Sequence, residues 1–273
     1  MTITRDGHIH SPFCPHGSSD SFHDYIESCI KNGIKTITFT EHAPLPEGFT
    51  DPVPDKDSAM PLAQLDRYLR ELNDLQSEYN NDISIKKGLE VDFIEGFEKN
   101  TEQFMNTYGP ELEDCILSSH FIKINSEYIC IDFSPDHFDR FVRLSGGPQK
   151  AEELYYRTVL RSTRAPLGTY APKRIGHMTL IRKFHRNYEY DFLDQNAIQA
   201  ILMEVQSRGL ELDANGAGTT KEKCLEPYPH PSVIQSAVQM GIPLVYGSDA
   251  HASSGLLAGS NDISALTGKQ LRQ

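Results

Sequence analysis

The sequence has few cysteines, no cationic clusters and no long apolar runs, and each shortage excludes a class of protein. Its five cysteines are scattered along 273 residues without a Cys-x-x-Cys pair, which excludes a disulfide framework and is typical of a reducing compartment. No apolar run reaches membrane-spanning length, and no basic-then-apolar segment of the secretion-signal type begins the chain. We therefore expect a cytoplasmic protein that makes no contact with membranes.

Positive charge is also scarce, because the formal net charge is −12 and lysine and arginine form no runs. A nucleic-acid surface needs clustered basic side chains, so we expect no nucleic-acid partner. An anionic substrate would need bound divalent cations at its site, because a metal ion is usually the largest local charge there.

The pattern of elements predicts one α/β domain over residues 1–273. Strands are expected where β-branched and apolar residues gather, at 2–8, 35–40, 83–91, 115–119, 173–177, 210–215 and 243–247, with a small hairpin at 122–131. Helical periodicity is expected at 19–33, 61–79, 96–108, from 134 onward, 149–162, 194–207 and 231–240, with a short helix after 257.

Distinctive polar residues lie at or just past the carboxyl ends of all seven predicted strands. They are His8, His10, Glu41, His42, Glu90, His120, His177, Asn215, Asp249 and His251. An open sheet gathers its site at one switch point, whereas a closed ring of strands brings all its strand ends to one mouth. We therefore expect a distorted, TIM-like (βα)7 barrel with its site at the carboxyl ends of the strands.

The first strand predicts a metal site. His8 and His10 alternate, so in extended chain both imidazoles point to one side, and His16 follows on a loop stiffened by two prolines. Imidazole with carboxylate is the usual ligand set of zinc, iron or manganese. The candidate metal ligands are His8, His10, His16, His42, Glu90, His120, His177, Asp249 and His251. Nine ligands imply two or three ions, with Glu90 as the natural bridge.

These motifs resemble the polymerase-and-histidinol-phosphatase (PHP) superfamily. The flanking segments 13–18, 40–49, 88–93 and 176–184 are similar to the PHP-type histidinol-phosphate phosphatases, and the resemblance covers about residues 6–255. It implies a distorted (βα)7 barrel with three metal ions. The implied ligand sets are His8, His10, Glu90 and Asp249; Glu90, His120 and His177; and His16, His42 and His251.

The resemblance also implies hydrolysis of L-histidinol phosphate to L-histidinol and phosphate in histidine biosynthesis, by attack of a metal-bridging hydroxide. The absence of a Cys-x5-Arg loop agrees with a reaction that uses no nucleophilic side chain. Glu90 would bridge the ions, and Asp249 or His251 would protonate the leaving group.

Candidate substrate-binding residues are chosen by charge. Arginine forks match phosphate oxygens, so Arg161 and Arg164 before the fifth strand, and Arg182 with Lys183 after His177, are candidates. A further candidate, Asp92, would pair with the substrate's amine or imidazole, or else would hold a ligand histidine.

Other functions share parts of this pattern. A PHP phosphoesterase could act on another small phosphate ester, or on nucleic-acid phosphodiesters, which the net charge opposes. An amidohydrolase also opens with His-x-His but often bridges its metals through a lysine, and Lys86 and Lys87 precede Glu90. A binding module with structural metals would close its coordination shells. The oligomeric state is left open, and an oligomer is compatible with the sequence.

Overall fold

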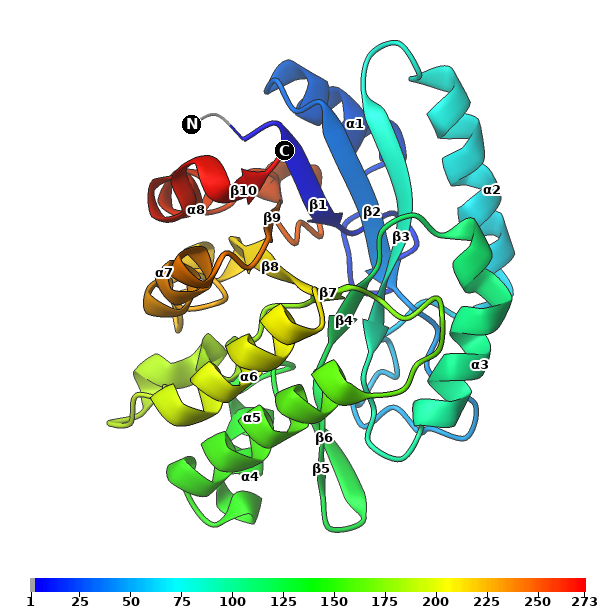
Figure 1. The fold of residues 1–273 in the computed structure, drawn as a ribbon. Coiled ribbons are helices and arrows are strands. Elements are labelled where there is room, and N and C mark those ends of the chain that lie inside the picture. Colours follow the sequence, from blue (N-terminus) through cyan, green and yellow to red (C-terminus); the bar gives the residue numbers. More distant parts are fainter. Residues whose placement is uncertain (1–2) are drawn as a thin grey trace.

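A row of parallel strands curls into a nearly closed barrel in the computed structural model, which describes residues 3–273 apart from the side chain of Lys269 (Figure 1). The strands of this sheet, in their spatial order, are β1 (Arg5–Ile9), β2 (Thr36–His42), β3 (Ser84–Asp92), β4 (Ile116–Ser118), β7 (Arg174–Ile175), β8 (Glu211–Asn215), β9 (Leu244–Gly247) and β10 (Leu271–Arg272). The predicted hairpin is the antiparallel pair β5 (Phe121–Ile124) and β6 (Glu127–Cys130).

Hydrogen bonds between the ends of β1 and β9 close the ring. Asp249 N donates to His8 O at 2.8 Å, and His10 N donates to Ala250 O at 3.1 Å. A parallel bridge joins Ile9 to Ala250. The closed ring brings the carboxyl ends of the strands to one mouth, as the predicted (βα)7 barrel requires.

All seven predicted strands are present in the sheet, and an eighth strand was missed. β10 pairs with the start of β9 through Leu271 and Leu244, and its two residues are too few to show an alternating pattern. Thr2, the first residue of the first predicted strand, lies outside the described residues.

Helices surround the strands (Figure 1). The α-helices are α1 (Phe22–Lys31), α2 (Leu62–Glu78), α3 (Glu98–Tyr108), α4 (Pro135–Ser145), α5 (Pro148–Arg164), α6 (Gln195–Ser207), α7 (Pro231–Met240) and α8 (Ser260–Thr267). The 3-10 turns are η1 (Gly109–Glu111), η2 (Leu180–Asn187), η3 (Ala217–Thr220), η4 (Ser253–Gly255) and η5 (Gly268–Gln270). Within residues 3–273, no helix combines the length and apolarity needed to cross a membrane.

The predicted start of the first helix at residues 19–20 is wrong. Ser21 caps α1, because its hydroxyl accepts from the Asp24 amide at 3.3 Å while the Asp24 carboxylate accepts from the Ser21 amide at 2.7 Å. Asp20 instead accepts from Ser253 N at 2.7 Å and joins this segment to the loop that follows β9.

The alternation of β2 explains how the barrel carries both a core and a site. Ile37 and Phe39 are fully buried, and Phe39 meets Phe22 of α1 edge-on with 4.9 Å between ring centroids. Thr38 faces the interior, where its hydroxyl donates to Asp114 at 2.8 Å. Because residues two apart share a face, the same interior row ends in His42 at the mouth.

A buried ion pair fills the barrel below the site. Arg174 is 1 % exposed, and its guanidinium donates to Asp114 at 2.6 Å. Asp114 also accepts from Arg5 at 2.7 Å. Gly7 leaves room for this group, because a Cβ at that position would lie 2.2 Å from Nη1 of Arg174.

Candidate metal centre

The strand ends surround a cavity of about 1000 Å³. Of the nine predicted metal ligands, those that line it are His16, His42, Glu90, His120, His177, Asp249 and His251. His8 and His10 are fully buried and lie next to the carboxylates of Glu90 and Asp249. The structure therefore brings all nine predicted ligands to one end of the barrel.

The first ligand group joins β1 to the loop after β9. One ligand atom each from His8, His10 and Asp249 lies within 4.8 Å of the others. Glu90 Oε2 lies 3.4 Å from His8 Nε2 and 3.5 Å from His10 Nε2. This arrangement matches the first ligand set that the resemblance implied.

The second group faces the other oxygen of Glu90. His177 Nε2 lies 2.8 Å from Glu90 Oε1, and His120 Nε2 lies 3.2 Å from His177 Nε2. Two imidazole nitrogens at this distance need a shared proton or a cation, because their lone pairs repel. Ser118 donates to the same Glu90 oxygen at 2.6 Å and holds the carboxylate between the two groups.

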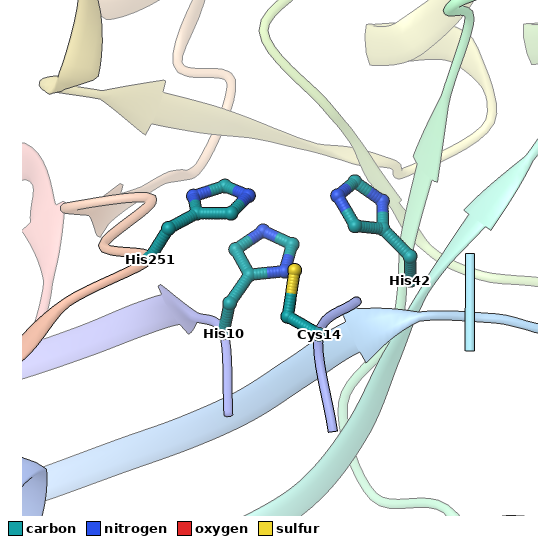
Figure 2. A group of neighbouring side chains, drawn as sticks. All are labelled: His10, Cys14, His42 and His251. Carbon is teal, nitrogen blue, oxygen red and sulfur yellow. The ribbon is translucent and has the colours of Figure 1, made fainter. Parts of the chain in front are cut away.

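A third group contains a residue that the sequence analysis did not choose. His10, Cys14, His42 and His251 have ligand atoms within 4.8 Å of one another, and Figure 2 shows the four side chains gathered from three separate segments. His16 lies beside this group, its ring centroid 5.1 Å from that of His42 and 5.2 Å from that of His251. It is exposed, and its Nδ1 pairs with Asp57 O at 2.8 Å.

The protonation chemistry fits a cation site. Burial lowers the pKa of His8, but the carboxylates of Asp213, Asp249 and Glu90 outweigh it and raise that pKa to about 10. Burial and the neighbouring His10 lower the pKa of His42 well below its usual value, so this imidazole is neutral and able to bind a metal. His8 Nε2 and His42 Nδ1 are buried and have no hydrogen-bond partner among the described residues.

Carboxylates orient three of the ligand histidines. Asp213 lies 2.8 Å from His8 Nδ1, and Glu41 lies 3.3 Å from His10 Nδ1. Asp92 lies 2.8 Å from His120 Nδ1. Such carboxylates fix the ring orientation and leave the opposite nitrogen for a metal. Of the two roles considered for Asp92, the structure favours that of holding a ligand histidine.

Sequence reasoning missed Asp213, although a signal was present. Asp213 and Asn215 alternate along β8 as His8 and His10 do at the end of β1. Asn215 Nδ2 donates to Asp213 Oδ2 and to Asp249 Oδ2, both at 3.1 Å. This bridging amide ties β8 to the ligand group and explains why a polar residue stands at the end of that strand.

The backbone of Asp249 is itself unusual, since its φ of 53° lies in the left-handed region that non-glycine residues rarely adopt. The hydrogen bond from Asp249 N to His8 O holds this conformation. It turns the carboxylate toward His10, where Oδ1 lies 3.2 Å from Nε2. Strain of this kind gathers at functional sites.

The three predicted phosphate-binding arginines are absent from the described residues that line the cavity. Arg161 pairs with Glu95 at 2.5 Å and Arg164 with Glu204 at 2.9 Å, and both side chains are about half exposed. Arg182 is buried against Glu226 and also pairs with Asp191 at 3.0 Å. Acidic neighbours on adjacent elements therefore hold all three guanidinium groups, which a local sequence pattern does not reveal.

The lysine next to Arg182 does line the cavity. Among the described lining residues, Lys183 and Lys221 are the cationic ones. Lys183 Nζ lies 3.0 Å from Asp132 Oδ2. Burial lowers the pKa of Lys183, but the carboxylates of Asp132 and Asp249 raise it by more than burial lowers it. This ammonium is therefore charged beside the proposed metal ligands.

Comparisons with known proteins agree with this geometry. The family model described as PHP domain matches residues 6–216. The histidinol-phosphatase of Bacillus subtilis (strain 168) is 45% identical over 249 residues, which is 90% of this chain and 93% of the relative.

Two solved structures have the same fold. A candidate histidinol phosphatase from Listeria monocytogenes superposes with a TM-score of 0.91 at 34% identity, over 94% of this chain and 99% of the other. A histidinol phosphate phosphatase from Lactococcus lactis, complexed with zinc, L-histidinol and phosphate, superposes with a TM-score of 0.74 at 20% identity, over 98% and 93%. The chain belongs to the PHP-domain family, among its metal-dependent histidinol-phosphatases.

Proposed function

We propose that this chain hydrolyses L-histidinol phosphate to L-histidinol and phosphate with two or three divalent cations held at the barrel mouth. The observation that carries the proposal is the position of Glu90, whose two oxygens face two separate groups of imidazoles in one cavity. The relative from Lactococcus lactis, which holds zinc, L-histidinol and phosphate on the same fold, supports the choice of ligand.

The proposed ligands are the nine residues of the sequence prediction, and zinc, iron and manganese all suit their mixture of nitrogen and oxygen atoms. When bound, such cations neutralise phosphate oxygens and lower the pKa of water. The protein's contribution is to fix the ligand rings before substrate arrives. Asp213, Glu41 and Asp92 do this from behind His8, His10 and His120.

We assign phosphate binding by the protein to Lys183 in place of the arginines. Its side chain is partly buried in the cavity wall, and Asp132 holds the ammonium in place. A charged group fixed in a poorly hydrated wall interacts with a phosphate oxygen more strongly than an exposed one would. Lysine acts here as a point charge, so it leaves the orientation of the phosphate to the cations.

The leaving alkoxide needs a proton, and Asp249 and His251 are the proposed sources. Both line the cavity, and His251 is about one-third exposed to solvent from which it can be reprotonated. The Nδ1 of His251 lies 3.1 Å from Asp249 O, so Nε2 can carry the proton only while it is not bound to a cation.

Phosphate release by metal-loaded protein tests this function. L-histidinol phosphate should be preferred over other monoesters and over a phosphodiester, and Glu90→Gln should abolish the activity. Comparable turnover of the diester would support the nuclease alternative. Turnover of a different monoester alone would keep the metal centre but change the substrate.

A further inference from the structure

The loop after β1 places a thiol inside the third ligand group. Cys14 is 7 % exposed, and its Sγ lies within 4.8 Å of ligand atoms from His10, His42 and His251 (Figure 2). None of the three ligand sets that the resemblance implies includes this sulfur, whose hydrogen-bond partners are His10 and His16. Sulfur and nitrogen atoms at such separations can share one tetrahedral ion.

Backbone hydrogen bonds fix the sulfur in that position. Cys14 N donates to Ser11 O at 3.0 Å, and Gly17 N donates to Cys14 O at 3.1 Å. Ser18 N donates to His251 O at 2.8 Å, which ties the end of the loop to the segment that carries a second member of the group. The thiol is therefore held by turns on both sides, as a ligand must be.

His42 gives a further indication of a bound cation beside this group. It is 8 % exposed, and its Nδ1 lies 3.2 Å from Glu90 Oε2 but makes no hydrogen bond among the described residues. A buried polar atom without a partner is costly, so a bound species is expected to satisfy it. The two nitrogens of His10 already face Glu41 and Asp249, at 3.3 and 3.2 Å. Cys14, His42 and His251 are the members left to share a cation.

We propose that Cys14 supplies a thiolate ligand to the cation held by His42 and His251, and that this thiolate makes the site selective for zinc over manganese and magnesium. Thiolates favour soft and borderline ions, whereas carboxylate and water suit manganese and magnesium. When the Sγ–metal bond forms, the thiol proton passes to solvent. The inference rests on the proposed cation binding at the mouth of the barrel and adds a ligand to it.

Cobalt(II) titration of metal-free protein tests the inference without measuring activity. Thiolate-to-cobalt charge transfer should appear in the near ultraviolet and should be lost in Cys14→Ser. Cys130→Ser is the matched control, because Cys130 is a buried cysteine that lines the cavity and belongs to none of the ligand groups. We expect that control to keep the band.

The results separate this inference from the proposed function. Cobalt uptake without a thiolate band, or with a band that survives Cys14→Ser, would overturn the inference alone, whereas no cobalt uptake would overturn both. X-ray absorption at the zinc edge of wild-type protein needs no variant, so it decides the question even where Cys14→Ser does not fold. A sulfur neighbour at about 2.3 Å supports the thiolate, and a shell of nitrogen and oxygen alone contradicts it.

Selectivity gives a third measurement. Removing an outer-shell partner of a metal lowers affinity roughly 10–100-fold, so losing a direct ligand should cost at least as much. Cys14→Ser should therefore lower zinc affinity by tenfold or more while changing manganese affinity little. An equal loss for both metals would contradict the proposed selectivity.

Discussion

Asp213 Oδ2 lies 2.8 Å from Nδ1 of His8, in the interior of the barrel where neither side chain is exposed. The two residues come from β8 and β1, which are far apart in the sequence and are brought together by closure of the ring. The carboxylate fixes which nitrogen of His8 remains for a cation. Closure of the barrel therefore also orients His8 as a metal ligand.

Asp213→Asn is expected to weaken cation binding. The amide keeps the size of the side chain but loses the charge that orients His8, so zinc affinity should fall roughly 10–100-fold. Competition with a chromogenic chelator measures the change. Asp262→Asn, at an exposed position in the first turn of α8, is the control and should bind zinc like the wild type. Equal affinity in Asp213→Asn would show that His8 needs no such partner.

Lys183→Gln is expected to weaken substrate capture. A hydrogen bond to a charged group contributes about 1.5–3 kcal/mol, so kcat/KM should fall roughly 10–150-fold. Steady-state kinetics with L-histidinol phosphate measures this, and zinc content should stay unchanged because Lys183 is not a proposed ligand. Arg161→Gln tests the arginine prediction in the same assay. Since Arg161 is half-exposed and paired with Glu95, its removal should leave kcat/KM near the wild-type value.

Sequence patterns predicted the strand ends well, because the cue there is local. The spacing of His8 and His10 predicts a shared face, Glu90 lies two residues before the end of β3, and Asp249 lies two residues after the end of β9. What escaped prediction depends on contacts between distant segments. Cys14 becomes recognisable as a candidate ligand only in the folded protein, where the loop after β1 contacts the segment of His251.

The predicted arginines lie outside the cavity wall for a related reason. Charge marks a residue as able to bind phosphate, but neighbours decide where the side chain points. Arg182 and Lys183 are adjacent in η2, yet Glu226 holds the first away from the cavity while Asp132 holds the second in its wall. The carboxylates that decide this lie in other segments of the chain. β10 is a similar case, because it is recognisable only by its pairing with β9.

Asp114→Asn is expected to destabilise the fold in a pH-dependent way. Burial raises the pKa of Asp114, but Arg174 and Arg5 outweigh it and leave that pKa below its usual value. A lowered pKa means that the ionised carboxylate stabilises the fold above the unfolded-state pKa, and that this contribution is lost as the pH falls through the folded value. At neutral pH the variant leaves Arg174 without its buried counter-ion, which should cost about 3–5 kcal/mol.

Urea unfolding from neutral to acidic pH measures that effect. The gap in unfolding free energy between wild type and Asp114→Asn should be constant near neutrality and should narrow in acid, where the wild-type carboxyl is protonated too. Glu204→Gln is the control, because that carboxylate pairs with arginines at the surface and its removal should change stability little. A gap that is independent of pH would contradict the linkage.

Zinc binding should stabilise the fold, and Glu90 should decide how much. Without cations, the centre holds buried carboxylates and imidazoles whose charges only protons can balance. Burial raises the pKa of Glu90, but the neighbouring histidines outweigh it and hold that pKa well below its usual value. A cation that binds the folded state alone adds about 2.7 kcal/mol when its free concentration is 100 times Kd. Thermal unfolding of chelated protein with and without zinc should therefore show a higher Tm with zinc.

Glu90→Gln loses the carboxylate that faces two ligand groups, so its zinc-dependent rise in Tm should shrink, whereas Glu127→Gln, on the exposed hairpin, should keep the full rise. An undiminished rise in Glu90→Gln would remove Glu90 from the metal centre, and with it the observation on which the proposed function depends.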